Sequence, residues 1–92
     1  MASGEAPVIL DVRSPEEFAS GHIPGAVNIP LNELSERLVA LGLSPTDEVV
    51  VHCERGGRAE AAESILRESG YTGVRDLSGH MAAWRAGGYP LE

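Results

Sequence analysis

Strand and helix signals alternate four times along the 92-residue chain, which leaves few folds open to it. The run Val8-Ile9-Leu10-Asp11-Val12 is almost unbroken and apolar, as in strands that are covered on both faces. Strands that alternate with helices pair in parallel, so the pattern predicts an α/β fold with a mainly parallel central sheet and helices on both faces. The four expected strands are short apolar or β-branched runs at residues 8–12, 26–29, 49–52 and 73–77.

Each expected strand is followed by a helical pattern. Ser14 can cap a short helix that begins at Pro15, and Glu17 completes a capping box three residues after the cap. Leucines at intervals of four and three predict the second helix. The later helices are expected over residues 32–41, over residues 59–69 and, capped by Ser78, around Met81 and Trp84.

Length and charge limit the function as well. Ninety-two residues allow one domain, which we place at residues 8–92 after a tail at residues 1–7. Seven basic residues against fourteen acidic ones give a formal charge of −7, so nucleic acids and anionic membranes are unfavourable partners. No apolar run approaches the ~20 residues of a membrane-spanning helix, and the first residues do not resemble a secretion signal. We therefore expect a cytoplasmic protein; a periplasmic location requires a leader that this sequence does not show.

The single cysteine, Cys53, stands where the third expected strand ends and a helix begins. Sites in parallel sheets form at the carboxyl ends of strands. Gly56 and Gly57 allow left-handed backbone angles, so several N–H groups can turn toward one point and hold an anion. The N-terminus of the following helix adds partial positive charge there, which lowers the pKa of a cysteine. The pattern predicts a nucleophilic thiolate.

Two arginines strengthen this interpretation. Arg55 and Arg58 bring two cations close to Cys53 against one carboxylate, Glu54, so the local field favours a small anionic substrate. A lone cysteine is more often a small buried hydrophobic residue, but such a residue needs neither the glycines nor the arginines that follow this one. We expect Arg58 to fold back over the loop, whereas Arg55 either contacts substrate or is merely solvated.

His52 suggests a cysteine–histidine pair. Neighbouring residues of a strand point to opposite faces of the sheet, so the His52 ring is expected to face away from the Cys53 sulfur and to pack or to bind backbone. A helix-stabilised thiolate needs no base. The candidate zinc ligands are His22, His52, Cys53 and His80, but their spacings do not match those of structural zinc sites. We expect no metal.

Five blocks, in order, resemble the rhodanese (thiosulfate sulfurtransferase) family over nearly the whole chain, from Val8 to Pro90. The resemblance implies a single rhodanese-like domain with four to five strands. The family often has a glycine where His80 stands and serine or threonine where Ala59 stands, and many relatives carry an extra strand and helix upstream. The blocks are Leu10-Asp11-Val12-Arg13 with Glu17-Phe18, Gly21-His22-Ile23-Pro24-Gly25-Ala26 with Asn28-Ile29-Pro30, Cys53 through Arg58, Leu77-Ser78-Gly79 with Trp84, and Gly88-Tyr89-Pro90.

The resemblance implies sulfur transfer without a metal or organic cofactor. Cys53 is implied to take sulfane sulfur from a donor such as thiosulfate, with release of sulfite, and to hold it as a persulfide until cyanide, a thiol or a protein removes it. Arg13 is implied to pair with a carboxylate such as Glu17 and to order the loops, rather than to act with Asp11 as an acid or base. The residues implied to bind the substrate and the persulfide are Glu54, Arg55, Gly56, Gly57 and Arg58.

Two other functions stay open. Rhodanese modules without activity serve as binding or regulatory domains, although they generally lack the cysteine that this chain keeps. Related phosphatases have five residues between cysteine and arginine, whereas four separate Cys53 from Arg58, so the loop is expected to hold a sulfur atom but not a tetrahedral phosphate. As partners we expect a small anionic sulfur donor and a thiol or thioredoxin-like acceptor, and we expect a monomer or weak dimer.

Overall fold

Four parallel strands form the centre of the computed structural model, which describes residues 7–77 and 79–92. The strands are β1 (Val8–Asp11), β2 (Val27–Asn28), β3 (Glu48–His52) and β4 (Gly73–Asp76), in the order β2-β1-β3-β4. All three strand pairs are parallel, as predicted. The α-helices are α1 (Pro15–Ala19), α2 (Leu34–Arg37), α3 (Gly57–Glu68) and α4 (His80–Ala86). The expected cap at Ser78 lies outside the described residues.

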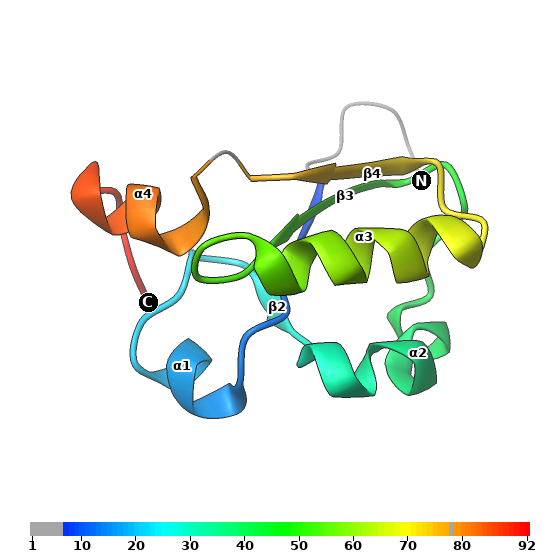
Figure 1. Cartoon of the computed structure of the whole chain (residues 1–92), viewed down its shortest axis with the longest axis horizontal. Coiled ribbons are helices and arrows are strands. Elements are labelled where there is room, and N and C mark those ends of the chain that lie inside the picture. The colour runs from blue at the N-terminus through cyan, green and yellow to red at the C-terminus, as the bar shows by residue number, and fades with distance from the viewer. Residues whose placement is uncertain (1–6, 78) are drawn as a thin grey trace.

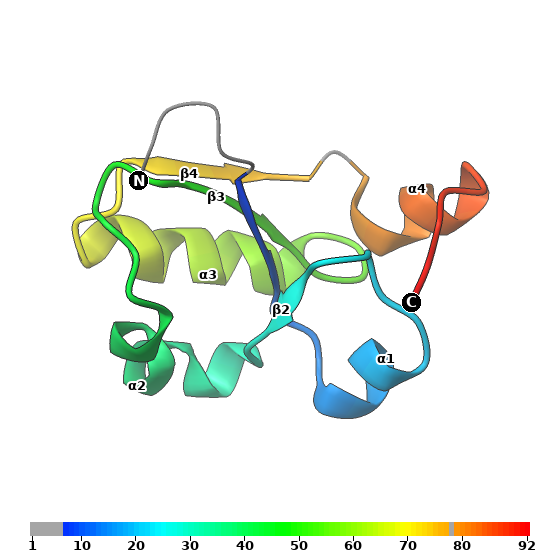
Figure 2. The same ribbon diagram turned by 180° about the vertical axis from the view of Figure 1, so that it is seen from behind.

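The helices are divided between one face of the sheet and the carboxyl ends of its strands (Figure 1). α2 and α3 lie together on one face, and the reverse view shows the same arrangement (Figure 2). α1 and α4 lie beyond the ends of the strands, on either side of the loop that leads into α3. Within the described residues no helix has the length and apolar character to cross a membrane. The buried core between sheet and helices includes Leu10, Val49, Val51 and Val74 from the strands and Leu34, Ala62 and Leu66 from the helices.

The register of β1 on β3 decides where a site can form. Asp11 of β1 pairs with His52 of β3, so the two central strands end at the same level. The residues that follow them, Val12 and Cys53, therefore leave the sheet at the same level, and Arg13 comes one residue later. This is the edge at which ligands bind in parallel sheets.

The start of α1 agrees with its sequence signal. The Ser14 hydroxyl accepts a hydrogen bond from the Glu17 N–H at 3.2 Å, and the Glu17 carboxylate accepts one from the Ser14 N–H at 3.0 Å. The capping box is thus complete, and Pro15 occupies the first turn. It also fixes the position of Glu17 close to the end of β1.

The second helical segment is less regular than predicted. The expected helix over residues 32–41 divides into a 3₁₀ turn η1 (Leu31–Glu33), the single α-turn of α2 and a second 3₁₀ turn η2 (Val39–Leu41). Hydrogen bonds between residues three apart close both ends, for example from the Gly42 N–H to the Val39 carbonyl at 3.2 Å. Leucine spacing does not distinguish these forms, because both keep Leu34 and Leu38 buried.

A buried polar network joins the ends of the strands. The Arg13 guanidinium donates to both carboxylate oxygens of Asp11 at 2.8–3.1 Å and to the Gly21 carbonyl at 2.9 Å. Both side chains are fully buried. Arg13 pairs with a carboxylate, as the resemblance implied, but the partner is Asp11 at the end of the same strand, and the example of Glu17 is wrong. The structural role expected for Arg13 agrees with these contacts.

His52 lies at the same level, fully buried. Its Nδ1 is 3.4 Å from the Cys53 carbonyl oxygen, and its Nε2 is 3.7 Å from an Asp11 carboxylate oxygen. As expected, it is a packed ring with a backbone partner. Burial lowers the pKa of His52, and the charge of Arg13 lowers it further, against the opposing effects of the Asp11 carboxylate and the Cys53 carbonyl.

We predict that Gly73→Ala destabilises the fold through a backbone collision. A Cβ on Gly73 would lie 2.6 Å from the Asp47 carbonyl oxygen, and β4 would have to move away from the turn before β3. The free energy of unfolding in urea should fall by about 1–3 kcal/mol. Gly57→Ala is the control, because a Cβ there has no neighbour within 4 Å, and its stability should not fall. Equal stability of the two variants would contradict the prediction.

A second prediction concerns pH. The pKa of His52 is lowered in the folded protein. Just below the ordinary pKa of about 6.5, His52 is therefore protonated in the unfolded chain to a greater extent than in the folded protein. The free energy of unfolding should therefore decrease as the pH falls from about 6.5 toward 5. His52→Gln should make this decrease shallower, as measured by urea unfolding at each pH. Parallel pH profiles for the two proteins would show that His52 does not contribute.

Candidate functional site

The loop between β3 and α3 wraps around the cysteine sulfur. The Gly56 N–H donates a hydrogen bond to Cys53 Sγ at 3.0 Å. Gly56 has a φ of +126°, a backbone conformation that residues other than glycine rarely adopt. The predicted positive φ is therefore confirmed at this residue. The expectation for Gly57 is wrong: it has no positive φ and is the first residue of α3. One left-handed glycine is enough to turn the chain into the helix.

The sulfur lies at the floor of a hollow. Cys53 as a residue is only 2% exposed and borders the hydrophobic core. It is nevertheless one of the residues that line a surface depression of about 520 Å³, so the depression reaches a cysteine that is packed against the core. The depression is also lined by Glu17, Glu54, Arg55, Gly57 and Arg58, which include four of the five residues predicted to bind substrate.

Arg58 was expected to fold back over the loop, and in the structure its side chain extends to α1. Its guanidinium binds the two Glu17 carboxylate oxygens at 2.6 and 3.1 Å. The hydrogen bond from Arg58 lowers the pKa of Glu17 to about 2, with the Ser14 N–H as the second cause. The pKa of Arg58 is raised, first by this hydrogen bond and also by the negative charge of Glu17. Arg58 thus links two helices beside the sulfur.

Glu54 is paired on the other side of the loop. Its carboxylate binds Arg85 of α4 and lies 3.5 Å from the buried Arg13 guanidinium. This acidic residue therefore anchors the loop. Sequence spacing did not indicate this role, because Arg13 and Arg85 are far from Glu54 in the chain.

Arg55 has a different environment. It is exposed at the tip of the loop and lines the hollow, and across residues 7–77 and 79–92 it has no hydrogen bond or ion pair. Its charge is therefore available to an incoming anion. The two possibilities that the sequence left for Arg55, contact with substrate and simple solvation, are both compatible with this position.

The first turn of α4 holds the loop from behind. The Met81 N–H donates to the Cys53 carbonyl at 3.2 Å, and the Ala82 N–H donates to the Glu54 carbonyl at 3.1 Å. The N–H and C=O of a planar trans peptide point in opposite directions, so the Glu54 and Arg55 N–H groups point away from α4. No local pattern indicated this clamp, since it depends on the docking of a distant helix.

The remaining candidates have structural contacts. His22 stacks on Phe18 with ring centroids 3.7 Å apart, and its Nδ1 lies 2.9 Å from the Phe18 carbonyl oxygen; these contacts fix the turn that follows α1. Within the part of the chain that the structure describes, no group of three or more histidine, cysteine, aspartate or glutamate side chains is placed to hold a metal ion. The four candidate zinc ligands therefore do not form a site.

Comparison with known proteins relates this geometry to a family. The model of the family described as "Rhodanese-like domain" matches residues 1–87. Thiosulfate sulfurtransferase PspE from Escherichia coli is 41% identical over 70 residues, which cover 76% of this chain and 67% of the relative. The human thiosulfate:glutathione sulfurtransferase is 37% identical over 99 residues, covering 91% of this chain and 83% of the relative.

A solved structure agrees in fold. The structure titled "rhodanese with anions from E. coli" superposes with a TM-score of 0.79 at 36% identity, over 95% of this chain and 98% of that one. The family match spans nearly all of the sequence, and the parallel sheet and the cysteine loop are consistent with it. This chain belongs to the rhodanese-like domain family.

Proposed function

We propose that this protein is a sulfurtransferase that moves sulfane sulfur from a small anionic donor, such as thiosulfate, to a thiophilic acceptor through a persulfide on Cys53. The observation that carries this proposal is the Gly56 N–H, which donates to Cys53 Sγ at 3.0 Å on the floor of a hollow lined by two arginines. The relatives named as thiosulfate sulfurtransferases support sulfur transfer in general.

In the first step the Cys53 thiolate attacks the outer sulfur of thiosulfate. A bond forms between Sγ and that sulfur, the S–S bond of thiosulfate breaks, and sulfite leaves with the electron pair. The product is an anionic persulfide. Main-chain N–H groups suit this charge, because they stabilise an anion without transferring a proton to it.

The loop supplies these groups in a fixed direction. The Gly56 N–H already meets the sulfur, and Gly57 and Arg58 begin α3, where N–H groups have no partner within the helix. The Glu54 and Arg55 N–H groups point away from the α4 clamp. We propose that together these donors surround the terminal sulfur of the persulfide.

In the second step the acceptor attacks the terminal sulfur. The bond between that sulfur and Sγ breaks, which returns the Cys53 thiolate. A cyanide acceptor leaves as thiocyanate, and a thiolate acceptor leaves as its own persulfide. The name of the human relative pairs thiosulfate with glutathione. For this chain we propose a small thiol or a thiol on a protein as the physiological acceptor.

We predict that thiosulfate adds one sulfur atom to the protein. Intact-mass measurement after incubation with thiosulfate should show the addition in the wild type and none in Cys53→Ala. Cyanide should then remove the sulfur and release one equivalent of thiocyanate. If the folded wild type gains no sulfur and yields no thiocyanate, the protein is better explained as a binding or regulatory module. Turnover of a phosphotyrosine mimic at a rate comparable to thiosulfate would instead favour a phosphatase.

A further prediction ranks the two arginines of the loop. Arg58→Ala should lower kcat/KM for thiosulfate by about tenfold or more, because it removes a cation beside Cys53 and also leaves the Glu17 carboxylate unpaired at the hollow. Arg55→Ala removes an exposed cation alone, so its effect should be about threefold, mainly in KM, and should weaken with salt. Steady-state kinetics at two ionic strengths measures both.

Two controls separate charge from structure. Arg75→Ala removes an exposed arginine that pairs with Glu48 on the distant strand edge, and it should leave the kinetics unchanged. Adding Glu17→Gln to Arg58→Ala should restore part of the lost kcat/KM, because the unpaired carboxylate is then neutral. A larger loss from Arg55→Ala than from Arg58→Ala would show that the roles of the two arginines were assigned wrongly.

A further inference from the structure

His80 has an unusual backbone for its residue type. Among the described residues it is the one non-glycine residue with a positive φ, at +53°, and it follows Gly79, whose φ is +74°. Cβ crowding makes this region uncommon for side-chain-bearing residues, although histidine, asparagine and aspartate occupy it more often than most. A glycine would adopt the same turn freely. The backbone therefore gives no reason for a histidine at this position.

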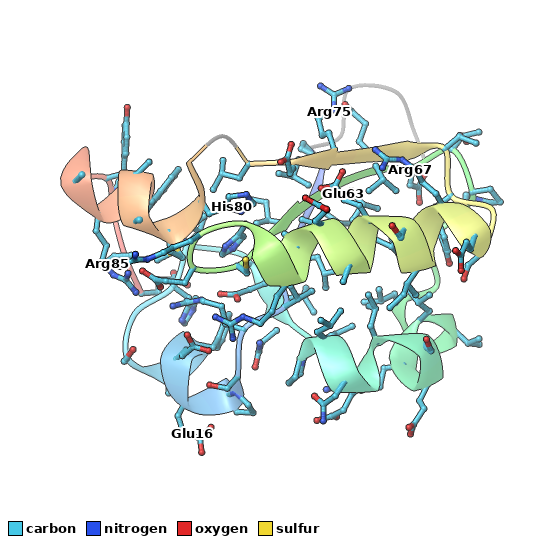
Figure 3. All side chains as sticks on the ribbon, in the orientation of Figure 1. Glu16, Glu63, Arg67, Arg75, His80 and Arg85 are labelled. Atoms are coloured by element: carbon cyan, nitrogen blue, oxygen red, sulfur yellow. The ribbon has the colours of Figure 1, made fainter. Side chains whose placement is uncertain are left out.

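The side chain of His80 lies against the sulfur-binding loop. The residue is 6% exposed, and its Nδ1 accepts a hydrogen bond from the Cys53 N–H at 3.3 Å. The other side of the ring faces Gly56, where an added Cβ would lie 3.1 Å from His80 Nε2. Figure 3 shows the labelled side chain between the start of α4 and this loop.

These contacts involve the two backbone positions that fix the sulfur. Cys53 carries Sγ, and Gly56 donates the N–H that meets it. One imidazole ring thus binds the main chain at Cys53 and lies close to the main chain at Gly56, the two ends of the contact between N–H and sulfur. A shift of either position would change the distance from the donor to Sγ and the direction of approach.

The hydrogen bond accepted by Nδ1 determines which nitrogen of the His80 ring carries the proton. Because Nδ1 accepts a hydrogen bond, it carries no proton, and the neutral ring has its proton on Nε2. The Asp76 carboxylate lies 3.8 Å from Nε2 and favours this tautomer. The ring therefore acts on the main chain of the loop, as an acceptor and as a support.

We infer that His80 is a positioning residue for sulfur transfer, whose Nδ1 holds the Cys53 N–H and whose ring supports Gly56, so that the sulfur keeps its N–H donor as a thiolate and as a persulfide. The inference rests on the proposed function. It concerns a residue of this chain at a position where a glycine would satisfy the turn.

Two substitutions separate the acceptor from the backbone turn. His80→Gly keeps the positive φ without strain but removes the acceptor and the ring. His80→Asn also tolerates a positive φ, and its side-chain oxygen, bonded to Cγ as Nδ1 is, can accept from the Cys53 N–H. The clamp from Met81 and Ala82 is main-chain and remains in both variants, so both are expected to fold.

The test is the single-turnover rate of persulfide formation with thiosulfate. For His80→Gly this rate should fall by about tenfold, with KM within about twofold of wild type, because loss of a positioning hydrogen bond affects the reacting geometry more than donor binding. His80→Asn should stay within about threefold of wild type. His22→Asn, which removes a histidine that stacks on Phe18, is the matched control and should react at the wild-type rate. A wild-type rate in His80→Gly, or an equal loss in His80→Asn, would overturn the inference.

Nuclear magnetic resonance gives a readout that does not depend on activity. The ¹⁵N spectrum of the imidazole should show His80 with its proton on Nε2 at neutral pH. Exchange of the Cys53 amide hydrogen should be faster in His80→Gly than in His80→Asn. A proton on Nδ1, or equal exchange in the two variants, would overturn the inference even if sulfur transfer is confirmed. If the wild type forms no persulfide, the proposed function fails, while these spectra still decide whether His80 holds the loop.

Discussion

A fully buried guanidinium holds the carboxyl ends of the sheet together. Arg13 binds Asp11 at the end of β1, the carbonyl of Gly21 in the turn after α1, and Glu54 in the loop around the sulfur. A buried charge is tolerated only when its partners are fixed, because an unpaired one is very costly. Each of these three segments therefore has to stay in place for the charge to be satisfied. The same pairing that stabilises the strand ends thereby limits the movement of the loop around Cys53.

The paired charges explain how an acidic chain can present an anion site. The protein carries a formal charge of −7, and two carboxylates, those of Glu17 and Glu54, lie at the hollow itself. Glu17 is neutralised by Arg58 and Glu54 by Arg85, so neither opposes an anion with a free charge. The group that the structure places against the sulfur is the main-chain N–H of Gly56, whose partial charge does not change with pH. Under the proposed function, selectivity for a small anion depends on the backbone of the loop more than on the net charge of the protein.

Local sequence patterns predicted those features of the fold and of the site that depend on residues close together in the chain. The four strands, the capping box of Ser14 and Glu17, the left-handed Gly56 and the loop around Cys53 all follow from short stretches of chain. Contacts between distant segments were not predictable in this way. The resemblance implied that Arg13 pairs with a carboxylate such as Glu17, whereas Arg13 binds Asp11 and Glu17 binds Arg58, 41 residues further along. Spacing indicates which charges are available, but the packing of α1 on the loop decides which of them meet.

The clamp from α4 shows why the end of the chain matters to a site near its middle. A loop can direct its N–H groups toward one sulfur only if its carbonyls find partners on the opposite side, because each peptide plane fixes the two directions together. The N–H groups of Met81 and Ala82 donate hydrogen bonds to the carbonyls of Cys53 and Glu54. The Arg85 guanidinium forms an ion pair with the Glu54 carboxylate. His80 adds an acceptor for the one N–H, that of Cys53, which lies on the same side. α4 therefore completes the hydrogen bonds that the loop itself leaves open, and the geometry at the sulfur is a property of both segments.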